Sequence, residues 1–76
     1  MKIFANASLE KYIRQSIRED IEANGKWEAD ADGLYGVDLV SFDGMPNVKY
    51  IWVRIESGRL NPRPRIEIVR QQLYSR

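Results

Sequence analysis

The sequence has 76 residues, of which 43% are hydrophobic and 30% charged, with a formal net charge of +1, no histidine and no cysteine. A chain of this length forms one domain, residues 1–76, whose single core buries only about 60–65% of the unfolded surface. Without histidine or cysteine, disulfides, thiolate zinc sites and catalytic pairs that use an imidazole or a thiolate are excluded.

The sequence contains no segment typical of membrane insertion. No run approaches the ~18 apolar residues of a membrane span. The first residues, MKIFANASLEKY, reach Glu10 and Lys11 before a hydrophobic region of signal-peptide length can form. Together with the lack of cysteine, these features predict a soluble cytoplasmic protein without a membrane partner.

The small net charge conceals an uneven distribution of charged residues. Residues 1–53 contain six Lys/Arg and nine Asp/Glu, whereas residues 54–76 contain six arginines and only two acidic residues. The planar guanidinium of arginine suits carboxylates, phosphates and aromatic faces better than the lysine ammonium does. The basic C-terminal part therefore indicates either attraction between the two parts of the fold or a partner that arginine recognises.

Residues 8–25 predict an amphipathic helix. Its apolar residues recur at helical spacing along one face: Leu9, Tyr12, Ile13, Ile17 and Ile21. We expect Ser8 to cap the first turn and Gly25 to end the helix in the left-handed conformation. Two ion pairs are expected four residues apart: Glu10 with Arg14, and Arg18 with Glu22.

The segment that follows the helix is dense in acidic residues. Residues 28–33, EADADG, resemble the start of a calcium-binding loop. The twelfth position of such a loop needs a bidentate glutamate, but Leu39 stands there. We therefore expect a solvated turn and no metal or cofactor.

Two β-strands are expected next. Residues 33–43 carry apolar side chains on both faces, with Gly36 as a candidate bulge. Residues 48–56, VKYIWVRIE, are rich in β-branched and aromatic types and predict the strongest strand of the chain. Residues 1–5, MKIFA, are a further candidate for a short edge strand.

The C-terminal segment, residues 65–76, fits two interpretations. Its sequence Ile-Glu-Ile-Val favours a strand. As a helix, it would have Asn61 as the cap, Pro62 in the first turn and apolar residues at helical spacing. The strand is preferred, and the predicted fold is α+β: one N-terminal amphipathic helix packed on a three-stranded antiparallel sheet, in the order α-β-β-β.

A single helix covers only one face of such a sheet. Alternation along residues 48–56 places Lys49, Ile51, Val53 and Ile55 under the helix. The opposite face then carries Val48, Tyr50, Trp52, Arg54 and Glu56. Either Tyr35 or Phe42 is expected to join it from the preceding strand. If the C-terminal segment were a helix, it would instead close this face and bury Trp52.

An uncovered aromatic face is uncommon on a monomer and typical of a protein interface. Beside it, the segment GRLNPRPR, residues 58–65, is expected to form a stiff loop because Pro62 and Pro64 restrict the backbone. We expect its arginines to border the aromatic face. The predicted partner-binding residues are Tyr50, Trp52, Arg54, Arg59, Arg63 and Arg65.

The sequence therefore predicts a small module without catalysis that binds a protein, as a homodimer, an inhibitor or an accessory subunit of a larger assembly. A second interpretation is binding of single-stranded RNA or DNA, with Tyr50 and Trp52 stacking on bases and arginines contacting phosphates. A third is a histidine-free ribonuclease of the small-toxin type, in which arginine and tyrosine stabilise the phosphate transition state. No motif in the sequence singles out that third function.

Overall fold

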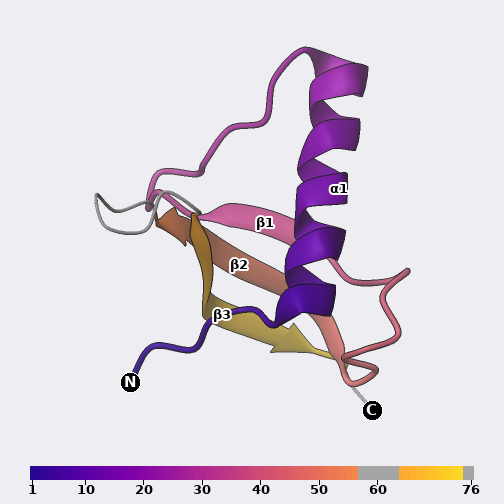
Figure 1. Ribbon diagram of the computed structural model, residues 1–76, viewed down its shortest axis with the longest axis vertical. Helices are drawn as coiled ribbons and strands as arrows, with labels where there is room; N and C mark the ends of the chain where they lie inside the picture. Colours follow the sequence, from indigo (N-terminus) through magenta and orange to yellow (C-terminus); the bar gives the residue numbers. More distant parts are fainter. Residues whose placement is uncertain (57–63, 75–76) are drawn as a thin grey trace.

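The computed structural model describes residues 1–56 and 64–74. These residues form one helix and a three-stranded sheet, which lie side by side in Figure 1. The sheet is antiparallel in the order β1-β2-β3, so the predicted α+β arrangement is confirmed. In the C-terminal segment, the residues Arg65–Leu73 form a strand and not a helix. The elements are α1 (Ala7–Asn24), β1 (Tyr35–Asp38), β2 (Val48–Glu56) and β3 (Arg65–Leu73).

The ends of α1 are fixed by two local signals. The N-cap is Asn6, whose side chain accepts a hydrogen bond from the amide of Leu9. The expectation that Ser8 caps the helix is therefore wrong, because Ser8 already lies within the first turn. Gly25 ends the helix as predicted, with φ at 79° and its amide bonded to the carbonyl of Ile21.

The N-terminal part of α1, as far as Ile17, packs on the sheet. Figure 1 shows α1 running across the strands, with its C-terminal turns extending beyond β1. Leu9 and Ile13 are accordingly buried, whereas Ile21 on the same stripe is 48% exposed. Among the described residues, no helix is long and apolar enough to cross a membrane.

The core lies between α1 and one face of the sheet. Its buried members are Leu9, Ile13, Val37, Leu39, Val48, Ile51, Val53 and Ile66. The first strand is shorter than expected because the chain turns after Asp38, whose carboxylate accepts from the amide of Val40. Val40 is consequently 73% exposed.

Two β-bulges change the simple alternation of β2 and β3. Val48 pairs with Leu73 and Tyr50 with Gln72, so Lys49 is an extra residue in β2. Because of this bulge, Val48 is buried in the core beneath α1 and not on the opposite face, which corrects the expectation from alternation. A second bulge lies in β3 at Val69, between the pairs that Arg70 and Ile68 form with β2.

The N-terminal segment lengthens the sheet beyond β3. The amide of Ala5 donates to the carbonyl of Ile66 at 2.8 Å, and the amide of Ile68 donates to the carbonyl of Ile3 at 2.8 Å. Phe4 thereby forms an antiparallel bridge with Glu67. Residues 1–5 thus occupy the edge position proposed for them, although only as a single bridge.

The acidic connection forms a turn. The carboxylate of Asp30 accepts from the amides of Asp32 and Leu34, at 2.9 and 3.0 Å, and Gly33 has φ at 76°. Within residues 1–56 and 64–74, no group of three or more acidic side chains is placed to hold a metal ion. The acidic residues of this segment therefore have a structural explanation as a side-chain-capped turn.

Candidate functional site: the open face of the sheet

The face of the sheet opposite α1 carries Tyr50, Trp52 and Arg54, as alternation along β2 predicts. No helix or strand of the described residues covers this face (Figure 1). Pairing with β3 and with the N-terminal segment brings further side chains to the same side. We call this surface the open face, and its residues are Phe4, Tyr50, Trp52, Arg54, Glu67 and Arg70.

Tyr50 and Trp52 form an aromatic pair at the centre of the open face. Their ring centroids are 4.9 Å apart with the planes inclined by 55°, and both side chains are half-buried. The Tyr50 ring lies over Gly36 of β1, where a Cβ atom would overlap the tyrosine hydroxyl. The absence of a side chain at Gly36 therefore allows Tyr50 to lie flat across two strands.

Charged side chains surround this pair, and each has a partner. Arg70 lies over the Trp52 ring, 5.1 Å from its centroid, and reaches the carboxylate of Asp32 at 3.9 Å. Arg54 donates to Glu67 at 3.4 Å. Glu67 is only 8% exposed, so its charge is largely withdrawn from water and depends on this arginine.

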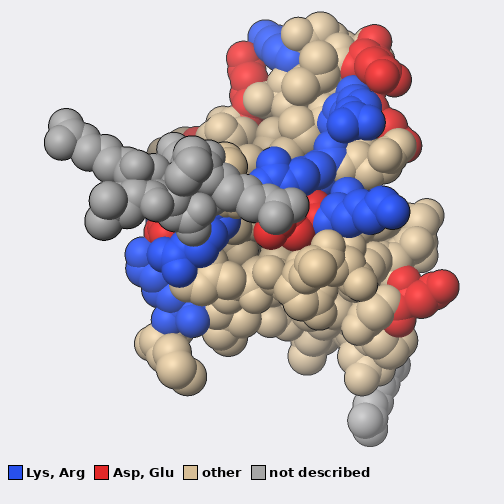
Figure 2. Space-filling view, in the orientation of Figure 1, with Lys and Arg blue, Asp and Glu red and all other residues tan. Residues whose placement is uncertain are grey.

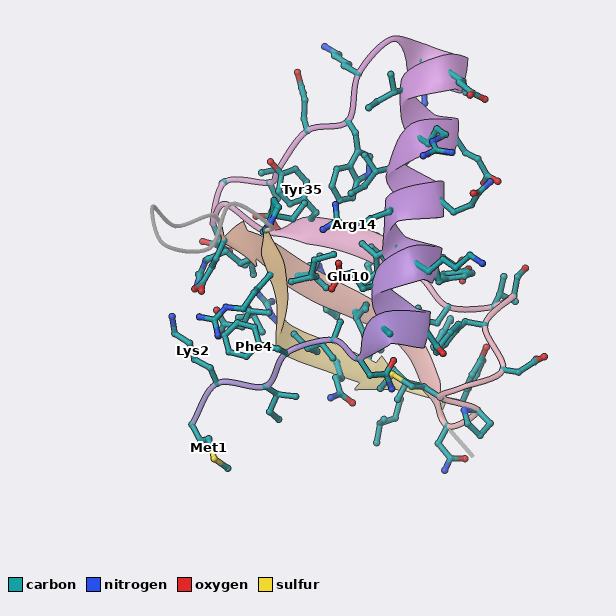
Figure 3. All side chains as sticks on the ribbon, in the orientation of Figure 1. Met1, Lys2, Phe4, Glu10, Arg14 and Tyr35 are labelled. Atoms are coloured by element: carbon teal, nitrogen blue, oxygen red, sulfur yellow. The ribbon has the colours of Figure 1, made fainter. Side chains whose placement is uncertain are left out.

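The N-terminal segment supplies a second aromatic position. The guanidinium of Arg65 lies 4.3 Å from the centroid of the Phe4 ring. The ammonium of Lys2 is 2.8 Å from the carboxylate of Glu56, and Figure 3 shows Lys2 and Phe4 near each other on this segment, two residues apart. The hydrogen bond from Lys2 is the main cause that lowers the pKa of Glu56, and the charges of Arg65 and Arg54 add to it.

The structure brings together four of the six predicted partner-binding residues on one side of the sheet. Tyr50, Trp52 and Arg54 lie next to one another, and Arg65 lies beside them at the N-terminal end of β3. The other two, Arg59 and Arg63, lie outside the described residues.

Sequence reasoning did not place Phe4, Glu67 or Arg70 on this surface, and it misjudged the role of Gly36 beneath it. Phe4 reaches it only because the N-terminal segment pairs with β3, and Arg70 only because of the bulge at Val69. Gly36 was noticed as a candidate bulge, whereas its role is to make room for the Tyr50 ring. The sequence pattern within one segment does not predict these positions, because each of them depends on how that segment pairs with a neighbouring strand.

The expectation that Tyr35 or Phe42 joins the open face is wrong. Tyr35 stacks on Trp27, with centroids 4.1 Å apart and planes inclined by 12°. Phe42 packs against Tyr12 of α1 at 5.2 Å. All four rings pack against the core beneath the helix, so the aromatic residues divide between the two sides of the sheet.

No protein-family model matches the sequence, and neither curated proteins nor solved structures give a significant match.

Proposed function

We propose that this protein is a binding module without catalysis that docks on a protein partner through the open face, as an inhibitor or accessory subunit or by self-association. The observation that supports it best is the Tyr50–Trp52 pair on a sheet face that no described element covers. Tyrosine, tryptophan and arginine are the residue types that contribute most binding energy in protein interfaces. The proposed location is the cytoplasm, an expectation based on the absence of cysteine from the sequence.

The pairing of charges favours a protein over a nucleic acid as the partner. Lys2, Arg54 and Arg70 each have a carboxylate within 4 Å, and Arg65 lies on an aromatic ring. Binding to a phosphate backbone draws its affinity from cations that replace condensed counterions. Cations that already pair with carboxylates contribute less to this phosphate-binding affinity. A polar rim of paired charges is, in contrast, common in protein interfaces.

A second copy of the chain is the first partner to test. The open face carries Arg54 and Arg70 beside Glu67, so a two-fold axis that passes between the arginines and the glutamate would place unlike charges opposite each other. Covering Tyr50 and Trp52 in this way would also remove an aromatic patch from water.

The test is light scattering of the pure protein and of Trp52→Ala, together with affinity capture from the native host using both proteins as bait. We expect Trp52→Ala to abolish the dimer, or the capture of the specific partner protein. The helical circular dichroism signal should be the same as that of the original protein. Val40→Ala is the matched control, because Val40 is 73% exposed but lies outside the open face. A monomer whose captured proteins are the same with both baits would contradict the proposal.

The nucleic-acid interpretation is tested on the same protein. Trp27→Phe leaves Trp52 as the single tryptophan, so its fluorescence reports on the open face alone. Short single-stranded oligonucleotides could quench the Trp52 fluorescence, with binding that weakens steeply as the salt concentration rises. That result would show that the partner of the open face is a nucleic acid and not a protein.

A further inference from the structure

A groove of about 620 Å³ lies between α1 and the beginning of β3, apart from the aromatic pair of the open face. Its volume is within the range of ordinary small-ligand sites. The residues that line it are Ala7, Glu10, Lys11, Arg14, Gln15, Arg18, Pro64 and Arg65. We call it the helix groove.

The helix groove is strongly basic. Four of its lining residues are cationic, and Glu10 is the single acidic residue among them. Figure 2 shows Lys and Arg side chains along this flank of α1, with an acidic patch between them. Concave surfaces lined by one sign of charge concentrate the electrostatic potential and raise the local concentration of oppositely charged ligands.

Glu10 is already neutralised within the groove. Its carboxylate oxygen accepts from Nε and Nη2 of Arg14, at 3.1 and 3.0 Å. Nη2 of Arg14 also donates to the carbonyl of Pro64 at 3.1 Å, which joins α1 to the chain just before β3. Figure 3 shows Glu10 and Arg14 projecting from the same side of α1. Arg14 therefore forms a fixed wall of the groove.

Lys11 and Arg18 have no such compensation, whereas Arg65 lies over the Phe4 ring and its charge acts on Glu56. Within the described residues, Lys11, Arg18 and Arg65 form no ion pair within 4 Å. The pair expected between Arg18 and Glu22 does not form, whereas the pair of Glu10 with Arg14 does. This differs from the open face, where the neighbouring cations have carboxylate partners.

The spacing of the helical cations suits an extended charged group. Lys11, Arg14 and Arg18 follow one another on one side of α1 and span about 10 Å of its axis. Several charges of a single ligand could thus be contacted at once. A single carboxylate or chloride would leave most of this row unused.

The lining also restricts the kind of ligand. Among the described residues that line the groove, none has an aromatic side chain on which a base could stack, and only Ala7 and Pro64 are apolar. A peptide would therefore find no apolar anchor pocket. We propose that the helix groove binds a small anion with two or more linked phosphoryl groups, held by Lys11, Arg18 and Arg65 against the wall formed by Arg14.

The experiment is calorimetric titration of the full chain with tripolyphosphate at low ionic strength, repeated with Arg18→Gln and Lys11→Gln. Both side chains are exposed on α1, and glutamine is also a good helix former, so the fold should persist. We expect each substitution to weaken binding about tenfold, as is typical for loss of one charge-assisted contact. Lys49→Gln removes a lysine outside the groove and should leave affinity within about twofold.

Three results would overturn the proposal. The first is a titration with tripolyphosphate that gives no heat of binding and no change in the backbone amide chemical shifts measured by nuclear magnetic resonance. The second is equal affinity for citrate, which would indicate a general carboxylate site. The third is binding of a single-stranded oligonucleotide without binding of tripolyphosphate, which would indicate a nucleic-acid surface. None of these depends on Trp52, so failure here is distinguishable from failure of the proposed protein interface.

Discussion

At the scale of single residues, the contact between Lys2 and Glu56 ties the N-terminus to the end of β2. The two charged atoms are 2.8 Å apart, and the interaction lowers the pKa of Glu56 from its ordinary value of 4.5. A carboxyl group with a lower pKa in the folded state stabilises the fold at pH values above 4.5. That stabilisation is lost as pH falls through the lowered pKa.

Lys2→Ala should therefore raise the pKa of Glu56 toward 4.5, because it removes the largest cause of the shift. Nuclear magnetic resonance titration of the side-chain carboxyl carbon measures this directly. Lys26→Ala is the control, since Lys26 pairs with Glu28 at 3.1 Å at a distant exposed position. An unchanged Glu56 titration in Lys2→Ala would show that Lys2 does not hold this carboxylate in solution.

The residues of the open face show how far sequence alone reaches at this scale. Tyr50, Trp52 and Arg54 follow from period-two alternation within one well-predicted strand. Phe4 and Arg70 do not, because their positions depend on strand pairing and on a bulge in β3. Glu67 reads as an ordinary alternating polar residue, yet it is nearly buried beside Arg54.

At the scale of elements, α1 combines an N-terminal part that packs on the core as far as Ile17 with C-terminal turns that extend beyond the sheet. Ile13 has no exposed surface, while Ile21, two turns further along the same stripe, is 48% exposed. The apolar periodicity is the same at both positions, so the sequence predicts one continuous buried stripe. The difference arises because the sheet has three strands and a short N-terminal edge among the described residues. The helix α1 is therefore longer than the sheet is wide, and its last turns extend beyond β1.

Ile13→Ala and Ile21→Ala make this difference measurable. We expect Ile13→Ala to lower the free energy of unfolding by about 2–5 kcal/mol, because it leaves a cavity in the core. Ile21→Ala should lower it by less than about 1 kcal/mol, because much of that side chain is already in water. Urea unfolding followed by circular dichroism gives both values. Equal losses would mean that the overhanging turns are covered in solution.

The type and order of the elements could be predicted, whereas their local irregularities could not. The 3.6-residue spacing of α1 and the β-branched run of β2 are properties of one segment each. The bulges at Lys49 and Val69 are relations between two strands, and they decide which face Val48 and Leu73 occupy. The true N-cap was missed for a related reason, since both Asn6 and Ser8 are suitable cap residues.

At the scale of the whole molecule, the ion pairs contribute little to the free energy of unfolding. Each of the five pairs among the described residues has one side chain that is at least 41% exposed. Exposed pairs are screened by salt and contribute little to folding. Stability therefore depends mainly on the small apolar core between α1 and the sheet.

Thermal unfolding should accordingly depend little on sodium chloride. We expect the midpoint temperature to change by less than about 5 °C between low salt and roughly 0.5 M salt. Differential scanning calorimetry measures this change, and the same scans at several protein concentrations report self-association. A decrease of the midpoint temperature by much more than this as salt is added would show that the surface charges form a stabilising network.

The bulges at Lys49 and Val69 also have a consequence for how related sequences would align. Each bulge is an extra residue that has no opposite residue in the pairing of β2 with β3, and both residues lie on the surface. Deleting either one leaves the residues on both sides of it facing as before. Natural relatives should therefore differ by single-residue gaps at these two positions more readily than elsewhere in β2 and β3. An alignment that treats the strands as strictly alternating would misplace the aromatic positions by one residue.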